Sequence, residues 1–265
     1  MFLLKQATKS ATITRLTLLT LLTLLTLFFL TPSYSTAAAG VQDHKTYHIA
    51  LYRGQAGCAG CSEMVYKSLI KTGLPLDITY VGEAEKLKVN EQTLRSFDIY
   101  VQPGGGQDIP GSYEALSDEG AEAVRNFVKS GKGFIGLCMG AYLAGKDWIG
   151  LVDTSLESEV GRPRSRAYDQ GDYTLQIDWN NKREPFYYQD GPYMDNGDPT
   201  DGFKAIAYYE NGDIAMARYK YGKGTVLLSG PHPEADETWI DSTMPGNTTA
   251  ESKMARILSY FDIKK

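Results

Sequence analysis

The sequence of 265 residues contains only three cysteines and three histidines, and it has no excess of basic residues. The scarcity of cysteine excludes a small fold that depends on many disulfides. With 27 Lys and Arg against 32 Asp and Glu, the net charge is −5, which excludes a basic surface that follows a nucleic-acid backbone. Hydrophobic residues make up 42% of the chain, so a disordered or collagen-like chain is excluded as well.

The N-terminal segment lacks acidic residues and has the features of an export signal. Basic residues precede an apolar run over residues 16–30, which is too short and too rich in threonine for a typical membrane span. Alanines at 37–39 offer small residues for cleavage. We predict a signal peptide over residues 1–39 and a mature domain over residues 40–265, exported to the periplasm or secreted. The alternative is an uncleaved membrane anchor. Cleavage removes three positive charges and gives a net charge of −8.

Short apolar runs alternate with amphipathic stretches between residues 46 and 150. The predicted elements are strands over Tyr47–Tyr52, Asp77–Val81, Phe97–Gln102 and Gly133–Leu137, and helices over Ser62–Thr72 and Ser117–Lys129. Because strands separated by helices form parallel crossovers, this order predicts a mainly parallel sheet with helices on both faces. Ligands of such sheets bind at the carboxyl ends of the strands.

The region from about 151 to 219 differs, since it is rich in tyrosine, asparagine and aspartate. It predicts antiparallel strands or hairpins over Tyr173–Trp179, Phe203–Glu210 and Asp213–Tyr219, with a long loop over Gln189–Gly202. A strand over Lys223–Leu228 and a helix over Ala250–Phe261 follow. The tyrosines form either an aromatic wall for a substrate or ordinary sheet packing. Arg162, Arg164 and Arg166 either recognise a carboxylate or lie on a solvated loop.

The segment Gly136-Leu137-Cys138-Met139-Gly140 lies where a buried strand is expected to turn into a helix. Flanking glycines relieve the crowding of a tight turn, so the pattern is typical of a nucleophile elbow with cysteine in place of serine. The start of a helix favours a thiolate and directs backbone N–H groups at a developing oxyanion. The alternative is a buried structural cysteine in a glycine-rich turn.

His232 follows the last predicted strand, two residues before Glu234. A nucleophilic thiol needs a base, and the base needs a group that holds its tautomer. Of the other histidines, His44 lies near the predicted mature N-terminus and His48 lies within the first strand. His232 is therefore the candidate base and Glu234 its carboxylate partner, unless this histidine is simply structural.

A glycine-rich segment, Pro103-Gly104-Gly105-Gly106, follows the third predicted strand. Backbone without side chains can donate N–H groups to an oxyanion there, although an ordinary glycine turn has the same sequence. Taken together and in this order, the cysteine, histidine and glycine segments resemble the class I glutamine amidotransferase-like superfamily. The resemblance implies a flavodoxin-like three-layer α/β/α sandwich with a mainly parallel sheet and a β-hairpin-rich insertion. The implied site consists of Cys138 as nucleophile, His232 as base, Glu234 as its partner, Gly105 and Met139 as oxyanion hole, and Gly106 and Tyr142 as substrate-binding residues.

Within that superfamily, the stretches 50–54, 102–106 and 136–145 are most similar to the biotin-protein ligase N-terminal-type domain. That domain type lacks the biotin-transfer module, and nothing in this sequence resembles a biotin-adenylate site. Tyr142 stands where glutamine amidotransferases usually have a glutamine that holds the substrate, and an exported chain meets little ATP. We therefore predict hydrolysis of an amide or related acyl bond through a thioester, with a non-catalytic binding domain as the alternative.

The expected ligand is a small-molecule or peptide-like substrate, without cofactor, metal, nucleic acid or, after cleavage, membrane; the sequence does not determine the oligomeric state. Cys58 and Cys61 lie in the loop after the first strand. In an oxidising compartment this spacing predicts a local disulfide. Redox exchange by the pair, or reversible pairing of either cysteine with Cys138, are the alternatives.

Overall fold

The computed structural model describes residues 45–241, 243, 246 and 249–264. The predicted signal peptide over residues 1–39 lies outside these residues. The described residues fall within the compact unit His44–Lys265. No helix among them is long and apolar enough to cross a bilayer.

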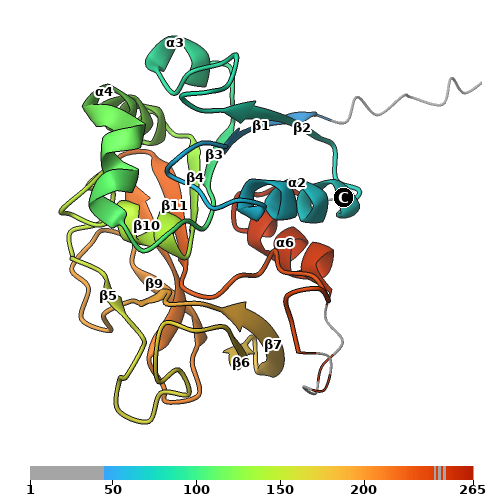
Figure 1. Ribbon diagram of the computed structural model, residues 1–265. Helices are drawn as coiled ribbons and strands as arrows, with labels where there is room; N and C mark the ends of the chain where they lie inside the picture. Colours follow the sequence, from blue (N-terminus) through green and yellow to red (C-terminus); the bar gives the residue numbers. More distant parts are fainter. Residues whose placement is uncertain (1–44, 242, 244–245, 247–248, 265) are drawn as a thin grey trace, which may run out of the picture. The chain divides into compact units, whose positions relative to one another are not determined.

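Parallel strands form one half of a nine-stranded sheet (Figure 1). They are β1 (Tyr47–Tyr52), β2 (Leu76–Val81), β3 (Ile99–Gln102), β4 (Gly133–Leu137) and β11 (Gly224–Ser229). Every residue of β3 and β4 is buried, as expected for central strands covered on both faces. The strand prediction for this half is correct to within two residues at each end.

Antiparallel strands form the other half of the same sheet. They are β6 (Tyr173–Trp179), β7 (Lys182–Tyr188), β9 (Lys204–Tyr208) and β10 (Ile214–Tyr221). The strand order is β2-β1-β3-β4-β11-β10-β9-β6-β7, so the predicted hairpins extend the main sheet. A separate two-stranded pair joins β5 (Glu157–Ser158) to β8 (Pro192–Tyr193). The sequence analysis missed β7, which contains Pro185; an edge strand tolerates proline because its outer side has no ladder partner.

Helices cover both faces of the sheet (Figure 1). The helices are α2 (Cys61–Lys71), α3 (Glu91–Leu94), α4 (Ile109–Lys129), α5 (Met139–Leu143) and α6 (Ala250–Ser259). One buried cluster packs α4 and α5 against the sheet, and a second packs α2 and α6 against its other face. The flavodoxin-like α/β sandwich predicted from the sequence is confirmed.

Helix α4 begins earlier than predicted. Ser117 interrupts it with φ 67° and ψ 159°, and its hydroxyl accepts a hydrogen bond from the Gly120 N–H at 3.2 Å. Ser117 therefore caps the predicted part of the helix, as expected. The missed first part starts at Ile109, where Asp108 accepts a hydrogen bond from the Gly111 N–H at 3.0 Å. Pro110 lies in the first turn of the helix, where a proline is tolerated, so it is compatible with this start.

Candidate active site

Cys138 lies at the sharp turn between β4 and α5. Its backbone has φ 51° and ψ −113°, a conformation that a residue other than glycine rarely adopts. The flanking glycines are required by close packing. A Cβ on Gly136 would lie 2.5 Å from the Gly140 carbonyl oxygen, and one on Gly140 would lie 2.2 Å from the Gln102 carbonyl oxygen. The turn places the thiol beyond the carboxyl end of a central strand, as the sequence pattern predicted.

The structure brings Cys138, His232 and Glu234 together, although the cysteine and the histidine are far apart in the sequence. The Cys138 side chain lies close enough to the His232 ring to raise the pKa of the imidazole. On the other side of the ring, Nδ1 lies 2.8 Å from the Glu234 Oε1. All three side chains are buried. The order thiol, imidazole, carboxylate is the one that nucleophilic catalysis by cysteine requires.

The environment of His232 favours its protonated form. Burial lowers the pKa of this imidazole, but the charges of Glu234 and Cys138 and their hydrogen bonds outweigh burial and raise the pKa to about 10. The aromatic rings of Tyr187 and Trp239 contact the imidazole, with ring centroids 5.3 and 5.8 Å away. The site therefore supports an imidazolium beside the sulfur.

The glycine segment after β3 packs directly against this group. A Cβ on Gly104 would lie 2.6 Å from the His232 Cε1, and one on Gly105 would lie 2.2 Å from the Met139 Cε. Only residues without side chains fit here, because the backbone passes so close to the imidazole and to the first residue of α5. The expected oxyanion-hole residues, Gly105 and Met139, are thus neighbours.

A disulfide joins Cys58 to Cys61 beside the glycine segment. The Cys58 N–H donates to the Gly104 carbonyl at 3.0 Å, so the disulfide loop contacts the segment that lies against His232. Cys138 is free, which agrees with the local pairing and gives no support to a bridge with Cys138. Among the described residues, no group of three or more His, Cys, Asp or Glu side chains is arranged to hold a metal ion.

A pocket of about 600 Å³ opens onto the thiol. Five of the predicted site residues line it: Gly105, Gly106, Cys138, Met139 and Tyr142. His232 and Glu234 are not among the lining residues, since they lie behind the sulfur. The pocket is large enough for a small molecule or a short peptide segment.

The sequence analysis missed one wall of this pocket, which Gln189 and Asp190 form immediately after β7. The Gln189 carbonyl accepts a hydrogen bond from the Cys138 thiol at 3.3 Å, and the Asp190 carbonyl accepts one from the Tyr142 hydroxyl at 3.1 Å. Ser158 on β5 donates to the Asp190 carboxylate at 2.5 Å. No local pattern marks these residues, because they fall in a stretch that reads as an ordinary loop.

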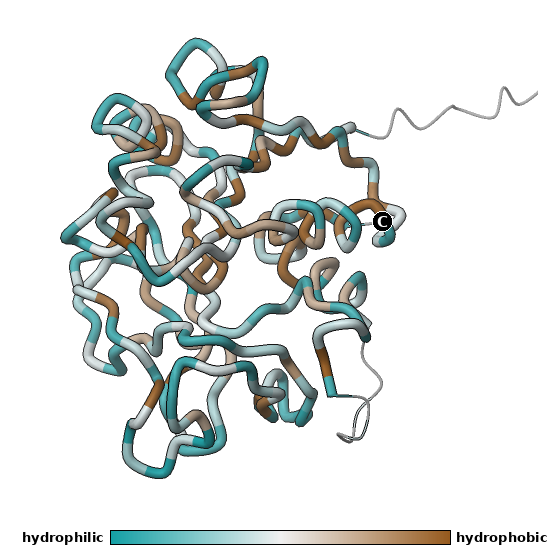
Figure 2. Tube along the Cα trace, viewed as in Figure 1, coloured by the Kyte–Doolittle hydropathy of each residue, from teal (hydrophilic) through white to brown (hydrophobic). Residues whose placement is uncertain are grey.

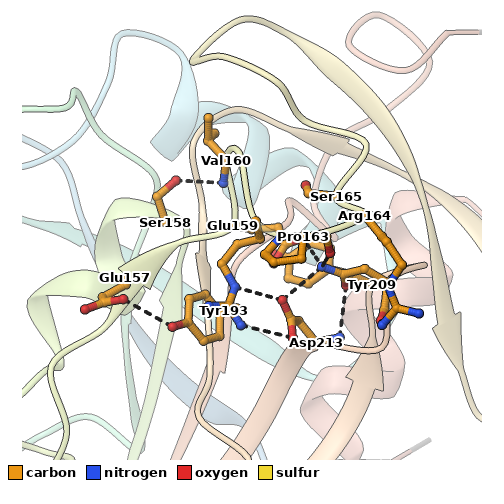
Figure 3. A network of polar contacts seen from close by, with 12 residues as sticks. Glu157, Ser158, Glu159, Val160, Pro163, Arg164, Ser165, Tyr193, Tyr209 and Asp213 are labelled. Carbon is orange, nitrogen blue, oxygen red and sulfur yellow. Dashed lines mark hydrogen bonds and ion pairs between the residues drawn. The ribbon is translucent and has the colours of Figure 1, made fainter.

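The three arginines after β5 do not line the pocket. Arg162 binds Asp213 through Nε at 2.9 Å and stacks on the ring of Tyr193, in the network shown in Figure 3. Arg166 pairs with Glu210 at 3.1 Å, and Arg164 donates to a backbone carbonyl. These arginines therefore hold the protein's own surface together and do not recognise a ligand at the thiol.

The tyrosines of the antiparallel half form sheet packing and no wall at the pocket. Tyr188 and Tyr209 are buried, their rings meet edge to face at 5.9 Å, and their hydroxyls donate to the carbonyls of Gly191 and Pro192. Tyr142 on α5 is the tyrosine that lines the described pocket. Of the two interpretations of the tyrosine-rich region, ordinary packing is the one that the structure supports.

Comparisons with known proteins agree with this architecture. Residues 47–165 match the family "Biotin-protein ligase, N terminal". The biotin–protein ligase of Schizosaccharomyces pombe is 23% identical over 220 residues, which cover 71% of this chain. The match spans 33% of that protein, so the chain corresponds to about a third of its length.

Two solved structures share the fold. A chain of PurLQS from Thermotoga maritima superposes with a TM-score of 0.57 and 17% identity, covering 82% of this chain and all of that one. A glutamine amidotransferase superposes with a TM-score of 0.55 and 14% identity, covering 79% of this chain and 97% of that one. The chain thus has the fold of these two structures. Together with the match of residues 47–165 to the biotin-protein ligase N-terminal family, this confirms the predicted resemblance.

Proposed function

We propose that this chain is a cysteine-dependent amidohydrolase of amidotransferase type. The Cys138 thiolate attacks the carbonyl carbon of an amide or related acyl group, and the backbone N–H groups of Met139 and Gly105 stabilise the oxyanion. His232 then donates its proton to the leaving amine, which departs and leaves a thioester. Water, deprotonated by His232, hydrolyses the thioester to the free acid and regenerates the thiol. Glu234 orients the imidazole throughout.

One observation carries this proposal: a free thiol that lines a pocket lies close to a buried imidazole, and a buried carboxylate is paired with that imidazole. Tyr142 argues against glutamine as the substrate, because its hydroxyl bonds to the Asp190 carbonyl at the position where amidotransferases usually hold glutamine. Biotin transfer is no part of the proposal, since the chain matches only a third of the curated biotin–protein ligase.

We further propose that residues 1–39 are a signal peptide and that the mature domain, residues 40–265, acts in the periplasm or outside the cell. The Cys58–Cys61 disulfide supports this compartment, because such bonds persist where the environment is oxidising. Mass spectrometry of the protein purified from its native host tests the assignment. A mature N-terminus at Gly40 supports it, and a chain that retains residues 1–39 in the cytoplasm contradicts it.

The test of the activity uses p-nitrophenyl acetate, an activated acyl donor that needs no knowledge of the natural substrate. We expect an acetyl thioester at Cys138, detected by intact mass, with release of p-nitrophenolate and slow hydrolysis of the adduct. Cys138→Ala abolishes the adduct, and His232→Ala slows its formation by on the order of 100-fold. His48→Ala is the matched control, since His48 lies exposed on β1 and bonds to Asp77.

The second candidate is a binding domain that keeps the fold without catalysis. The observation that favours it is the hydrogen bond that the thiol donates to the Gln189 carbonyl, because a thiol held in this way is a weaker nucleophile. Equal acetylation of the wild type and His232→Ala would support this candidate, because the imidazole would then contribute nothing to the reactivity of the thiol.

A further inference from the structure

The charged residues of the pocket at Cys138 are of one sign. Among the described residues, its lining includes two carboxylates, Glu157 and Asp190, and no lysine, arginine or histidine. A negative charge in a partly enclosed pocket attracts cations and repels anions more strongly than the same charge on an open surface. The lining therefore discriminates between ligands by their charge.

Asp190 is held in a fixed position at this wall. Its carboxylate accepts hydrogen bonds from the Ser158 hydroxyl at 2.5 Å and from the Gln170 side-chain amide at 2.8 Å. Its backbone has φ 50°, and the next residue, Gly191, packs so closely that a Cβ would lie 2.0 Å from the Gly230 carbonyl oxygen. Together with the hydrogen bond from Tyr142, these contacts fix the carboxylate before a ligand arrives.

In the part of the chain that the structure describes, no ion pair joins Asp190 or Glu157 to a basic residue, and the nearby Arg162 and Arg166 are paired with Asp213 and Glu210. Both donors to Asp190 are neutral. Each carboxylate oxygen accepts two hydrogen bonds or more, so each keeps capacity for a cationic donor.

We propose that the pocket selects amide substrates that carry an ammonium or guanidinium group beside the scissile carbonyl, and that Asp190 is the residue that determines this specificity. The inference rests on the proposed function, because it assigns the substrate class of the same site. Asp190 follows the residue whose carbonyl contacts the Cys138 sulfur, so a cation bound to its carboxylate lies next to the reacting carbonyl. An anionic amide would instead meet two uncompensated carboxylates.

The experiment uses two methanethiosulfonates that differ in the charge of the transferred group, trimethylammonioethyl and sulfonatoethyl. The thiolate attacks the reagent's sulfenyl sulfur, a mixed disulfide forms, and methanesulfinate leaves. Cys138 is the only free thiol, so the rate of modification reports on this pocket alone. The ratio of the cationic to the anionic rate is divided by the same ratio for 2-mercaptoethanol, which removes the intrinsic difference between the reagents.

We expect a normalised ratio of about 5 to 20 for the wild type, since a nearby carboxylate attracts one reagent and repels the other. Asp190→Asn lowers the ratio at least threefold, by an order-of-magnitude estimate from the same electrostatics. This variant preserves the acceptor for Ser158, and the Gln170 amide can rotate to accept. Asp153→Asn, which removes an exposed carboxylate outside the pocket, leaves the ratio within about 1.5-fold.

A wild-type ratio near one, or a ratio that Asp190→Asn does not change, overturns the inference about the substrate while leaving the proposed chemistry standing. Failure of the proposed chemistry has a different signature. In that case His232→Ala reacts with both reagents at the wild-type rate, whatever the ratio between them. The two hypotheses are therefore tested separately in the same set of measurements.

Discussion

The two halves of the sheet contribute different parts of the pocket. In the parallel half, β3 and β4 are buried along their whole length and end in the glycine segment and in Cys138. In the antiparallel half burial is less complete, since β9 is exposed at both ends and β10 is exposed near its C-terminal end, and Figure 2 shows the hydrophobic colours concentrated in the parallel half. The wall that carries Asp190 comes from the antiparallel half.

Strand β11 belongs to both halves, since it pairs in parallel with β4 and antiparallel with β10. It ends just before His232, so the imidazole lies where the two halves meet. The two halves therefore contribute different parts of the candidate site. The parallel half holds Cys138 and the glycine segment at strand ends, and the antiparallel half supplies one wall of the pocket. Substitutions in the first half are expected to change reactivity, and those in the second to change stability or selectivity.

The largest expected effect concerns the reactivity of the thiol. Because the pKa of His232 is raised to about 10, the imidazolium persists beside the sulfur through the neutral range. Under the proposed function this cation promotes attack by the sulfur, so His232→Ala is expected to react with iodoacetamide at pH 7 more slowly than the wild type, by on the order of 100-fold. Alkylation rates of the two proteins, with His48→Ala as control, measure this. Equal rates for the wild type and His232→Ala contradict it.

The next effect belongs to the antiparallel half and to stability alone. Burial and the neighbouring Asp213 raise the pKa of Glu159 to about 7, in the network of Figure 3. Between about pH 4.5 and pH 7 the unfolded chain releases this proton and the folded chain keeps it, so the free energy of unfolding falls as the pH rises. Glu159→Gln should remove this loss. The effect of the substitution on the free energy of unfolding should therefore be more favourable at pH 8 than at pH 5, by about 2 kcal/mol.

Urea unfolding at the two pH values measures the effect of Glu159→Gln. The variant keeps an acceptor for the Asn211 amide, which lies 2.8 Å from Glu159 Oε1. Glu122→Gln, at an exposed position on α4, is the control. The rate of alkylation of Cys138 should stay at the wild-type value, and a decrease would show that the two halves are not separable in this way.

A third prediction compares two glycines of the same segment. Gly104→Ala places a methyl group against the His232 ring, displaces the imidazole and lowers the alkylation rate by on the order of tenfold. Gly106→Ala has open space around the added methyl group and should change the rate by less than about twofold. Equal rates for the two variants would show that the close approach to the imidazole is not needed for reactivity.

The smallest expected effect is at the contact between the halves. Tyr142→Phe removes the hydroxyl that donates to the Asp190 carbonyl and should lower the free energy of unfolding by about 1 kcal/mol. Tyr208→Phe, with a ring that is 40% exposed, is the control and should have no measurable effect. Thermal unfolding of both variants tests this, and a neutral Tyr142→Phe would mean that the hydrogen bond does not hold the wall.

Much of the parallel half could be predicted from the sequence because its signals are local. The elbow at Cys138 needs small residues on both sides, and the apolar run of β4 needs no partner to be recognised. His232, Pro233 and Glu234 are likewise adjacent in the sequence. These features combine into a recognisable site even though the strands that carry them are far apart in the chain.

The wall at Asp190 could not be predicted for the opposite reason. Its position depends on Ser158, Gln170 and Tyr142, which come from three separate segments and share no pattern. The same holds for β7, whose Pro185 is acceptable only because the strand lies at the edge of the sheet. Side-chain partners of this kind are set by long-range packing.

The amino-acid sequence by itself determined the alternation of strands and helices, the elbow and the candidate site residues, because each of these depends on neighbours along the chain. Only the tertiary structure decided that the thiol, the imidazole and a paired carboxylate lie close together, and that Asp190 lines the same pocket with no ion-pair partner among the described residues. The physical reason is that strand order and register bring together residues whose spacing in the sequence carries no information about their distance.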